Sequence, residues 1–256
     1  MPHATGRADA AHAVVFSPLD GAGRAVLVEQ RLTDAIVAGV LHDGERLPSE
    51  SALARSLGVA VVTAREALEA LRDKGLVLTR RGRDGGSFVT YDRDVSTRMI
   101  DERVHALSRI ELRDLSLHVA AIAGMAAEVA ADRASDDDVQ SLVDIDARAD
   151  LSTPGGARRA AGRFQLEVAA LSQSPRLVHE ELRLQADAGP LLWLCLRDED
   201  YRDRSRTMRL EVIDAIRAVD PAAARRATTD HIQQAVEWLI DEKARIEASA
   251  PPTRKE

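Results

Sequence analysis

Arg65 is the residue whose type and position first suggest chemistry, because it stands near the start of a predicted helix, Val61–Lys74. A shorter predicted helix precedes it across a tight turn at Gly58, and such a pair can place its second helix in the DNA major groove. There a guanidinium can donate two hydrogen bonds to O6 and N7 of guanine. The alternative is a surface ion pair with Glu69, four residues further along the same helix. The spacing alone leaves both of these roles open for Arg65.

A second group of basic residues marks the tip of a predicted β-hairpin. Leu76–Thr79 and Ser87–Thr90 have the composition of short strands, and an arginine- and glycine-rich turn joins them. Such a basic tip can contact phosphates or enter a minor groove. Ser49 and Thr63 could also contact phosphates, although plain helix-capping roles are equally open. The predicted DNA-contacting residues are Ser49, Ser51, Thr63, Arg65, Arg80, Arg81, Arg83 and Gly85.

Caps and apolar spacing predict the elements that position these side chains. A first helix is expected from about Gly23 to Val40. Ser49 is expected to cap the next helix, and Gly58 is expected to end it with a left-handed turn. The predicted buried positions are Leu27, Leu32, Ile36 and Val40 in the first helix, Leu53 and Leu57 in the second, and Ala64, Ala67, Leu68 and Leu71 in the third.

The run from Leu47 to Leu76 combines several motifs at fixed spacing. It resembles the winged helix-turn-helix of the GntR family of bacterial regulators, and the resemblance covers about residues 24–91. The resemblance implies a DNA-contacting arginine at Arg65. The residues that carry it are Leu47, Pro48, Ser49, Glu50, Ser51, Leu53, Ala54, Val59, Arg65, Glu66, Ala67, Leu68, Leu71, Gly75 and Leu76.

This chain departs from the usual pattern of that family at the DNA surface. Members usually carry a polar residue and then an arginine after the Gly-Val turn, where this chain has Ala60 and Val61. A basic residue often follows the glutamate of the Pro-Ser-Glu motif, where this chain has Ser51. Each good base contact contributes roughly 1–3 kcal/mol of discrimination. We therefore expect an unusual operator, weaker specificity, or more dependence on the wing and on DNA shape.

Composition and charge limit the classes of function. Among 256 residues, 45% are hydrophobic and 3% are aromatic, which suits two mainly helical domains. The net charge of −7 argues against nucleic acid, but residues 24–84 carry ten basic and nine acidic side chains, and DNA binding responds to local patches. No signal peptide, membrane span, nucleophile–base pair or phosphate-binding loop is visible. We expect a cytoplasmic protein that makes no membrane contact and is not an enzyme.

From Asp92 onward the sequence predicts helices and almost no strands. A short linking helix could occupy 93–107. Ser135, Pro175, Pro190 and Pro221 stand where new helices could begin. The predicted helices cover about 111–134, 135–149, 157–172, 175–187, 190–219, which could be broken, and 221–247.

This helical part resembles the FCD effector domain of the FadR-type branch, over about residues 93–247. Many FCD domains hold a divalent metal through an Asp-x3-His on one helix and two histidines on later helices. The matching positions here are Ala161, Gln165, Arg209 and His231. One imidazole beside an arginine cannot hold a metal. The prediction is that the chain has no metal site and needs no cofactor. The residues that carry the resemblance are Glu111, Leu112, Arg113, Ala126, Ala127, Ala131, Phe164, Asp214, Ala215, Ile216, Asp220 and His231.

The same positions suggest an effector pocket. Gln165, Arg209 and His231 could form a polar site that favours an anion, and Arg113 resembles a family arginine that often faces the effector. Such a site would suit an organic acid or an acyl thioester. The alternative is structural: Arg209 would pair with a surface acid, and His231 would be a core histidine with its hydrogen bonds satisfied.

The predicted fold class is mainly α, with a winged helix-turn-helix of three helices and a β-hairpin wing followed by an all-α helical-bundle effector domain. The predicted regions are a flexible arm (1–22), a DNA-binding domain (23–91), a ligand-binding and dimerisation domain (92–248) and a flexible tail (249–256). The predicted function is regulation of transcription, with the protein acting as a repressor. It would bind a palindromic operator in double-stranded DNA as a homodimer, because two heads together read enough base pairs. The alternative is a ligand-binding or scaffolding protein with a degenerate DNA-binding head.

Overall fold

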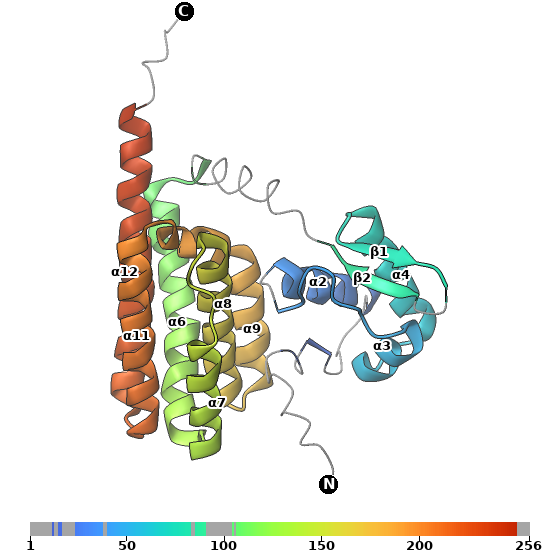
Figure 1. The fold of residues 1–256 in the computed structure, drawn as a ribbon, viewed down its shortest axis with the longest axis horizontal. Coiled ribbons are helices and arrows are strands. Elements are labelled where there is room, and N and C mark those ends of the chain that lie inside the picture. The colour runs from blue at the N-terminus through green and yellow to red at the C-terminus, as the bar shows by residue number, and fades with distance from the viewer. Residues whose placement is uncertain are drawn as a thin grey trace, which may run out of the picture.

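The computed structural model describes residues 12, 15, 16, 24–37, 40–82, 85–90, 104 and 106–249. The described part consists of a small N-terminal head, which contains the one sheet, and a larger bundle of helices (Figure 1). The predicted mainly helical fold class, with a β-hairpin after the first helices, is confirmed. The head consists of α2 (Arg24–Val37), α3 (Glu50–Leu57), α4 (Val61–Asp73), β1 (Val77–Arg80) and β2 (Gly86–Val89).

Local signals set the ends of α3 and α4. The Ser49 hydroxyl accepts a hydrogen bond from the backbone N–H of Ala52 at 3.2 Å and caps α3. Gly58 ends that helix at a φ of 66°, in the left-handed region that glycine adopts without strain. Helix α4 begins after Ala60, whose methyl group makes no capping bond. The buried face of α4 is the predicted one, formed by Ala64, Ala67, Leu68 and Leu71.

Strands β1 and β2 pair antiparallel and form a wing directly after α4. The register pairs Val77 with Val89, and both side chains are buried in the core of the head. Arg46, in the loop before α3, adds an isolated bridge to Phe88. Residues 83 and 84, in the turn of the wing, lie outside the described residues. The wing is therefore attached to the head both through its valines and through the loop.

Helix α2 differs from its prediction in its end and in its buried face. It ends at Val37, whereas Val40 lies in a bend. Leu27 is 37% exposed, and the neighbouring Val28 is buried in its place. The helix packs against both α4 and α9, and the apolar spacing alone did not show which of two adjacent residues faces these neighbours. Our prediction of Leu27 as a core residue was wrong.

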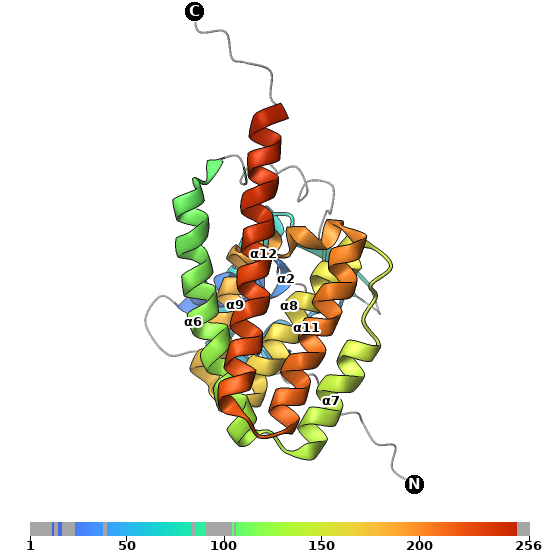
Figure 2. The same cartoon turned by 90° about the vertical axis from the view of Figure 1, so that its left-hand side faces the viewer.

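The bundle places long helices side by side, with α6 running along α12 (Figure 2). Helix α11 lies between α7 and α12 in the same view, and α8 and α9 lie behind them. In Figure 1 the C-terminal end of α12 extends past the other helices. The bundle consists of α6 (Arg109–Arg133), α7 (Asp136–Ala147), α8 (Pro154–Leu171), α9 (Pro175–Asp187), α10 (Gly189–Leu192), a 3-10 helix η1 (Trp193–Arg197), α11 (Glu199–Arg217) and α12 (Pro221–Ser249).

Capping residues start several of these helices. The Ser135 hydroxyl accepts a hydrogen bond from the backbone N–H of Asp138, whose carboxylate accepts one from the backbone N–H of Ser135. This reciprocal pair satisfies two donors at the start of α7. Helix α8 begins at Pro154, earlier than the predicted residue 157, because a threonine caps it there. Pro175 stands in the first turn of α9, as predicted.

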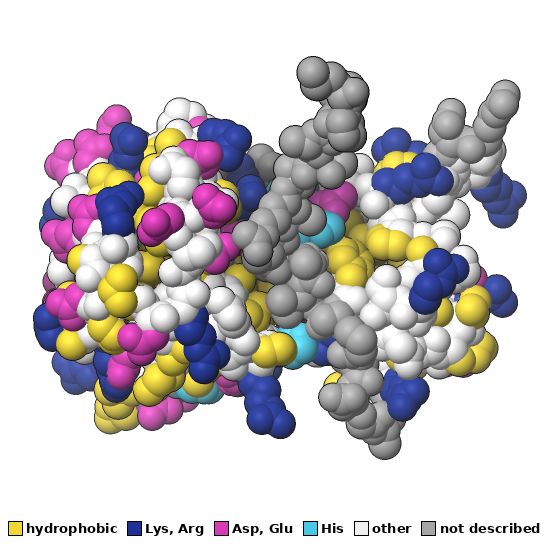
Figure 3. Space-filling model, turned by 90° about the horizontal axis from the view of Figure 1, so that it is seen from below, with side chains coloured by type: hydrophobic (Ala, Val, Ile, Leu, Met, Phe, Trp, Pro, Cys, Tyr) yellow, Lys and Arg dark blue, Asp and Glu magenta, His cyan; other side chains and the backbone are white. Residues whose placement is uncertain are grey.

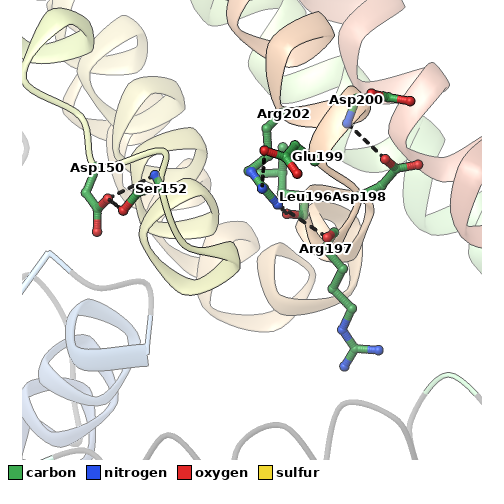
Figure 4. A network of polar contacts seen from close by, with 8 residues as sticks. All are labelled: Asp150, Ser152, Leu196, Arg197, Asp198, Glu199, Asp200 and Arg202. Atoms are coloured by element: carbon green, nitrogen blue, oxygen red, sulfur yellow. Dashed lines mark hydrogen bonds and ion pairs between the residues drawn. The ribbon is translucent and has the colours of Figure 1, made fainter.

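The predicted helix over 190–219 is broken into α10, η1 and α11. Asp198 lies at the break and caps α11 by accepting a hydrogen bond from the backbone N–H of Asp200 at 3.0 Å. Arg202 donates from one guanidinium nitrogen to the carbonyl oxygens of Leu196 and Arg197, each at 3.3 Å (Figure 4). These bonds satisfy carbonyl groups that the end of η1 leaves without helical partners.

The hydrophobic core of the head continues into the bundle. Leu166 of α8 and Leu182 of α9 belong to the same buried cluster as the core leucines of the head. Part of the predicted flexible arm joins this cluster as well, because Val15 is fully buried in it. His12 Nε2 lies 2.9 Å from Glu45 Oε1. These described residues of the arm are packed on the head, and the rest of the predicted arm lies outside the described residues.

Helix α6 is the one helix among the described residues that is long and apolar enough to span a membrane by length and composition. Half of its most apolar stretch is buried inside the bundle. A core helix of a soluble protein passes the same test, so the apolar character of α6 is explained by its packing against α8 and α12.

Candidate functional site

The exposed face of α4 carries Arg65 beside two apolar residues. Arg65 Nε donates a hydrogen bond to Glu50 Oε2 of α3 at 2.9 Å, and the Arg65 side chain remains 55% exposed. Its partner is therefore Glu50 rather than the predicted alternative, Glu69. Val61 and Val62, at the start of α4, are both exposed. This face presents an oriented guanidinium and branched methyl groups to solvent, which are groups that can contact a guanine edge and a thymine methyl.

Ser49, Ser51 and Thr63 lie close to this face. Ser49 Oγ caps α3 and lies 3.2 Å from Ser51 Oγ, and both serines are exposed. Thr63 is half-buried in the first turn of α4. The capping role of Ser49 is thus confirmed. Phosphate contacts by all three residues stay a prediction.

The wing is held in place by a residue that sequence reasoning missed. Arg46 donates from Nη2 to the carbonyl oxygen of Gly85 at 2.6 Å. A Cβ on Gly86 would lie 2.9 Å from Arg46 Nε, so glycine allows the guanidinium to approach the wing. The signal was present in the sequence as an arginine directly before Leu47 and Pro48, but nothing in the spacing connected it with the glycines.

The predicted basic residues of the wing are exposed where the structure describes them. The Arg80 guanidinium stacks 4.6 Å from the centroid of the Phe88 ring, which fixes its direction. Arg81 is exposed in the turn, and Arg83 lies outside the described residues. In the view of Figure 3, basic side chains stand out around the head, whereas the bundle carries a mixture of basic and acidic ones.

Three of the four predicted effector-binding residues lie in the interior of the bundle. Gln165 of α8, Arg209 of α11 and His231 of α12 are all at most 2% exposed. Arg113, in contrast, is exposed on α6 and does not lie in the interior, so its contact with an effector stays a prediction. The helical spacing of α6 turns Leu112 and Ser116 inward and leaves Arg113 on the outer face.

Arg209 forms a buried ion pair. Its Nε donates to Asp146 Oδ1 of α7 at 2.6 Å, and its Nη1 donates to Ser205 Oγ at 3.2 Å. The guanidinium carbon lies 5.9 Å from the centroid of the Phe164 ring. The predicted alternative of a surface acid is therefore wrong, because Asp146 is itself 5% exposed. The charge of Arg209 is balanced inside the protein.

His231 is a neutral imidazole. Its Nε2 lies 2.9 Å from Ser205 Oγ, and its ring centroid lies 5.0 Å from that of Trp193. Burial, together with the nearby charge of Arg209, lowers the pKa of His231 to about 3. We assign the Ser205 hydroxyl as the acceptor of the hydrogen bond from Arg209 and as the donor of the hydrogen bond to His231 Nε2. With Nε2 accepting, the proton of the neutral imidazole lies on Nδ1.

Several buried polar atoms around this cluster have no hydrogen-bond partner among the described residues. They include Gln165 Nε2, Arg209 Nη2 and His231 Nδ1. Buried polar groups are otherwise almost always hydrogen-bonded. His231 also lines a surface cavity of about 250 Å³ between α11 and α12. The interior of the bundle therefore holds nitrogen atoms whose hydrogen-bonding capacity is unused, and His231 is the one of these three residues that borders this cavity.

A second buried polar group adjoins this cluster through Trp193. Gln185 donates to Glu181 Oε1 at 2.7 Å, and its own amide oxygen accepts from Trp193 Nε1 at 2.9 Å. Burial raises the pKa of Glu181 to about 7. Sequence reasoning missed these residues. The spacing of four between Glu181 and Gln185, like that between Ser205 and Arg209, was the available signal, since it places both members on one helix face.

The interior cluster does not fit a metal ion. In the four positions that correspond to metal ligands in FCD domains, His231 is the one ligand type, and the Arg209 guanidinium would repel a cation. The described residues contain no group of three or more histidine, cysteine, aspartate or glutamate side chains placed to hold a metal. A metal is thus not part of the chemistry that we assign to the bundle.

Comparison with known proteins matches both parts of the chain. Residues 25–89 match the family described as bacterial regulatory proteins, gntR family, and residues 114–234 match the FCD domain. The chain is 36% identical over 248 residues to a Mycobacterium gastri protein described as an HTH-type transcriptional regulator, RmpR, and the match covers 93% of this chain and 90% of that protein.

A more distant relative and a solved structure give further matches. An Escherichia coli K12 protein described as an L-lactate dehydrogenase operon regulatory protein is 29% identical over 238 residues, covering 81% of this chain and 86% of that protein. A solved GntR-family transcriptional regulator from Pseudomonas syringae pv. tomato covers 95% of this chain and 99% of its own at 16% identity, with a TM-score of 0.46.

Proposed function

Because the chain belongs to the GntR family of bacterial regulatory proteins and carries an FCD domain, we propose that it is a repressor controlled by a small anionic metabolite. DNA binding by the winged head and effector binding by the helical domain are properties of this family. The repressor role, the anionic effector, the homodimer, the palindromic operator and the cytoplasmic location are parts of the proposal. No catalytic role is proposed.

The observation that carries the proposal is that Gln165, Arg209 and His231 are all buried in the bundle, where the Ser205 hydroxyl joins Arg209 to His231. Each of these residues has a buried nitrogen atom without a partner among the described residues. With the imidazole proton on Nδ1, all three nitrogens are donors, and a carboxylate or phosphate supplies acceptors for them. One relative is described as a regulator of an L-lactate dehydrogenase operon, and lactate is a small carboxylate.

The repressor mechanism follows from the geometry of two heads on DNA. A dimer places two recognition helices about one helical turn apart and reads a palindrome. An effector that favours a different spacing of the heads lowers the operator affinity, and such couplings are typically about 1–3 kcal/mol. An organic acid or an acyl thioester in the bundle would therefore release the operator.

The first experiment is a salt titration of binding to DNA from around the protein's own gene. We expect affinity to fall steeply with salt, because contacts to phosphates release counterions. Arg65→Ala is expected to weaken binding about 10- to 100-fold, since a guanidinium on a base contributes roughly 1–3 kcal/mol. Arg206→Ala, which removes an exposed arginine of α11, is the matched control and should bind like the native protein.

The effector is tested in the same assay with organic acids and acyl thioesters. The proposal predicts that at least one of them lowers DNA affinity and raises the melting temperature, and that Gln165→Leu reduces both effects. If no compound changes the DNA affinity or the melting temperature, control by a metabolite is contradicted. The result of the salt titration, which tests DNA binding, is not affected by that outcome.

A second candidate function rests on Ala60 and Val61, which are exposed and place apolar side chains where the family usually has hydrogen-bonding ones. In that case the head is degenerate, and the chain is a ligand-binding or scaffolding protein. DNA affinity that does not respond to salt or to Arg65→Ala would favour this alternative over the repressor.

A further inference from the structure

A second cavity lies between the bundle and the head. It has a volume of about 310 Å³ and is bordered by α7, by the loop that joins α7 to α8, by the first half of α8 and by His42 of the head. Ligand pockets in proteins begin at roughly 300 Å³. The cavity is therefore large enough for a metabolite with a few carboxylate or phosphate groups.

Three arginines border this cavity: Arg148 at the end of α7, and Arg159 and Arg163 one turn apart on α8. The Arg148 side chain is 76% exposed and lies 3.8 Å from Asp144. Arg159 and Arg163 are half-buried, so their stems are held by packing while they border the cavity. Arginines gathered in this way suit a planar anion, because a guanidinium can bond a carboxylate or phosphate in a two-pronged manner.

The two carboxylates that border the cavity are already engaged. Asp146 accepts the hydrogen bond from buried Arg209. Asp150 accepts hydrogen bonds from the backbone N–H and the hydroxyl of Ser152, at 3.0 and 2.6 Å (Figure 4). These bonds lower the pKa of Asp150, with a smaller contribution from the charge of Arg159. The three arginines outnumber these two carboxylates along the border of the cavity, so the charge of its lining favours an added anion.

The cavity contacts both functional parts of the molecule. His42 belongs to the loop before α3, and its backbone N–H donates to Glu45 of the same loop at 2.8 Å. Asp146 and Phe164, which contact Arg209 in the interior, border the cavity on its bundle side. A molecule in this cavity would therefore lie between the loop of the head and the interior cluster.

We propose that this cavity is a second binding site, distinct from the interior cluster, for a small organic polyanion held by Arg148, Arg159 and Arg163. The bound anion also contacts His42 and so ties the head to the bundle. The binding step stands independently of the proposed repressor function, whereas its effect on DNA affinity rests on that function.

The test is calorimetric titration of the full-length protein with citrate and, separately, with inorganic pyrophosphate, so that carboxylate and phosphate chemistry are compared. We expect at least one of the two to bind the native protein. The double variant Arg159→Gln and Arg163→Gln should weaken binding at least about tenfold, since hydrogen bonds to a charged group contribute roughly 1.5–3 kcal/mol. Arg206→Gln is the matched control and should bind normally.

Two further variants separate this site from its neighbours. His42→Ala should retain most of the anion affinity but reduce the effect of the anion on DNA affinity. Gln165→Leu, in the interior cluster, should retain the part of the citrate or pyrophosphate binding that the arginine double variant removes. Circular dichroism and melting temperature without ligand establish that each variant is folded.

Three results would overturn the proposal. If the folded arginine double variant still binds the anion as the native protein does, the cavity is excluded as the binding site. Loss of binding in Gln165→Leu with retention in the double variant assigns the anion to the interior cluster, and the repressor function then stands without this site. The third is that neither anion binds the native protein by calorimetry. A site that binds anions but never alters salt-dependent DNA affinity supports the binding step and overturns the tie to the head.

Discussion

The head and the bundle each contain an arginine–carboxylate pair between neighbouring helices, and the two pairs differ in their exposure to water. Arg65 meets Glu50 at 2.9 Å with 55% of its side chain exposed, whereas Arg209 meets Asp146 at 2.6 Å with 1% exposed. An exposed pair contributes little to stability and can exchange its partner for a phosphate or a base. A buried pair cannot lose one member without leaving a charge in the interior. The head is therefore built to exchange ionic partners, and the bundle to keep them.

Removing the buried cation should have the largest effect. Arg209→Leu leaves the Asp146 carboxylate buried without its partner, and breaking such a pair costs about 3–5 kcal/mol. We expect this loss in the free energy of unfolding, measured with urea. The double variant Arg209→Leu and Asp146→Leu should recover most of the stability, because no charge is then buried. A single variant as stable as the native protein would contradict the assigned role of the pair.

The buried carboxyl of Glu181 should give the next largest effect, and it depends on pH. Burial raises its pKa from 4.5 to about 7, so the folded protein binds this proton more tightly than the unfolded chain does. Its stabilising contribution is complete below pH 4.5 and is lost as the pH rises to about 7, a change of at most about 3 kcal/mol.

The measurement is urea unfolding of the native protein and of Glu181→Gln between pH 4.5 and 8. The variant should gain stability relative to the native protein as the pH rises. The pKa of His231 is lowered to about 3, so this residue makes the folded protein less stable as the pH falls. Because His231 is present in both proteins, its contribution cancels in the difference between their free energies of unfolding. A difference that stays constant with pH would contradict burial of an ionisable Glu181.

On the head, Arg65→Lys should alter recognition and leave folding unchanged. Lysine keeps the charge but lacks the fork that bonds both guanine acceptors, so discrimination between operator and random DNA should fall by roughly 1–3 kcal/mol. Binding to random DNA should stay nearly the same. Competition binding with both DNAs measures this, and equal losses on the two would indicate that Arg65 contacts phosphate.

The smallest effect is expected from the exposed carboxylate. Glu50→Gln removes the charge opposite Arg65 and should change the free energy of unfolding by less than about 1 kcal/mol. Because the competing anion is gone, DNA affinity should stay the same or rise. A large loss of stability would show that the pair between α3 and α4 is structural, and the contrast with Arg209 would disappear.

Short-range signals in the sequence predicted most of the fold. Helix α3 begins after Ser49 and ends at Gly58, as expected, and Gly75 and the wing strands follow α4. These features were predictable because caps and left-handed turns depend on a few neighbouring residues. The buried stripe of α4 was also predicted. Where the outcome depended on a distant partner, as with Leu27 on α2, the apolar spacing left adjacent residues equivalent.

The site was predicted less completely for the same reason. Gln165, Arg209 and His231 were chosen by resemblance, and all three are buried, with Arg209 and His231 joined through Ser205. Arg209, however, is paired with Asp146, which lies 63 positions away in sequence, and no local pattern indicates that partner. Arg113 was predicted from resemblance alone, and its place on the helix turned it to solvent.

The presence of Leu166 and Leu182 in the core of the head has a consequence for dissecting the protein. A fragment that ends after the wing would lack both leucines and would uncover the side of α2 that packs on α9. It would expose apolar surface, tend to associate, and melt at a lower temperature than the same residues do in the full chain. In calorimetry, the intact chain should show head and bundle unfolding in one transition, so the two parts share a single cooperative unit.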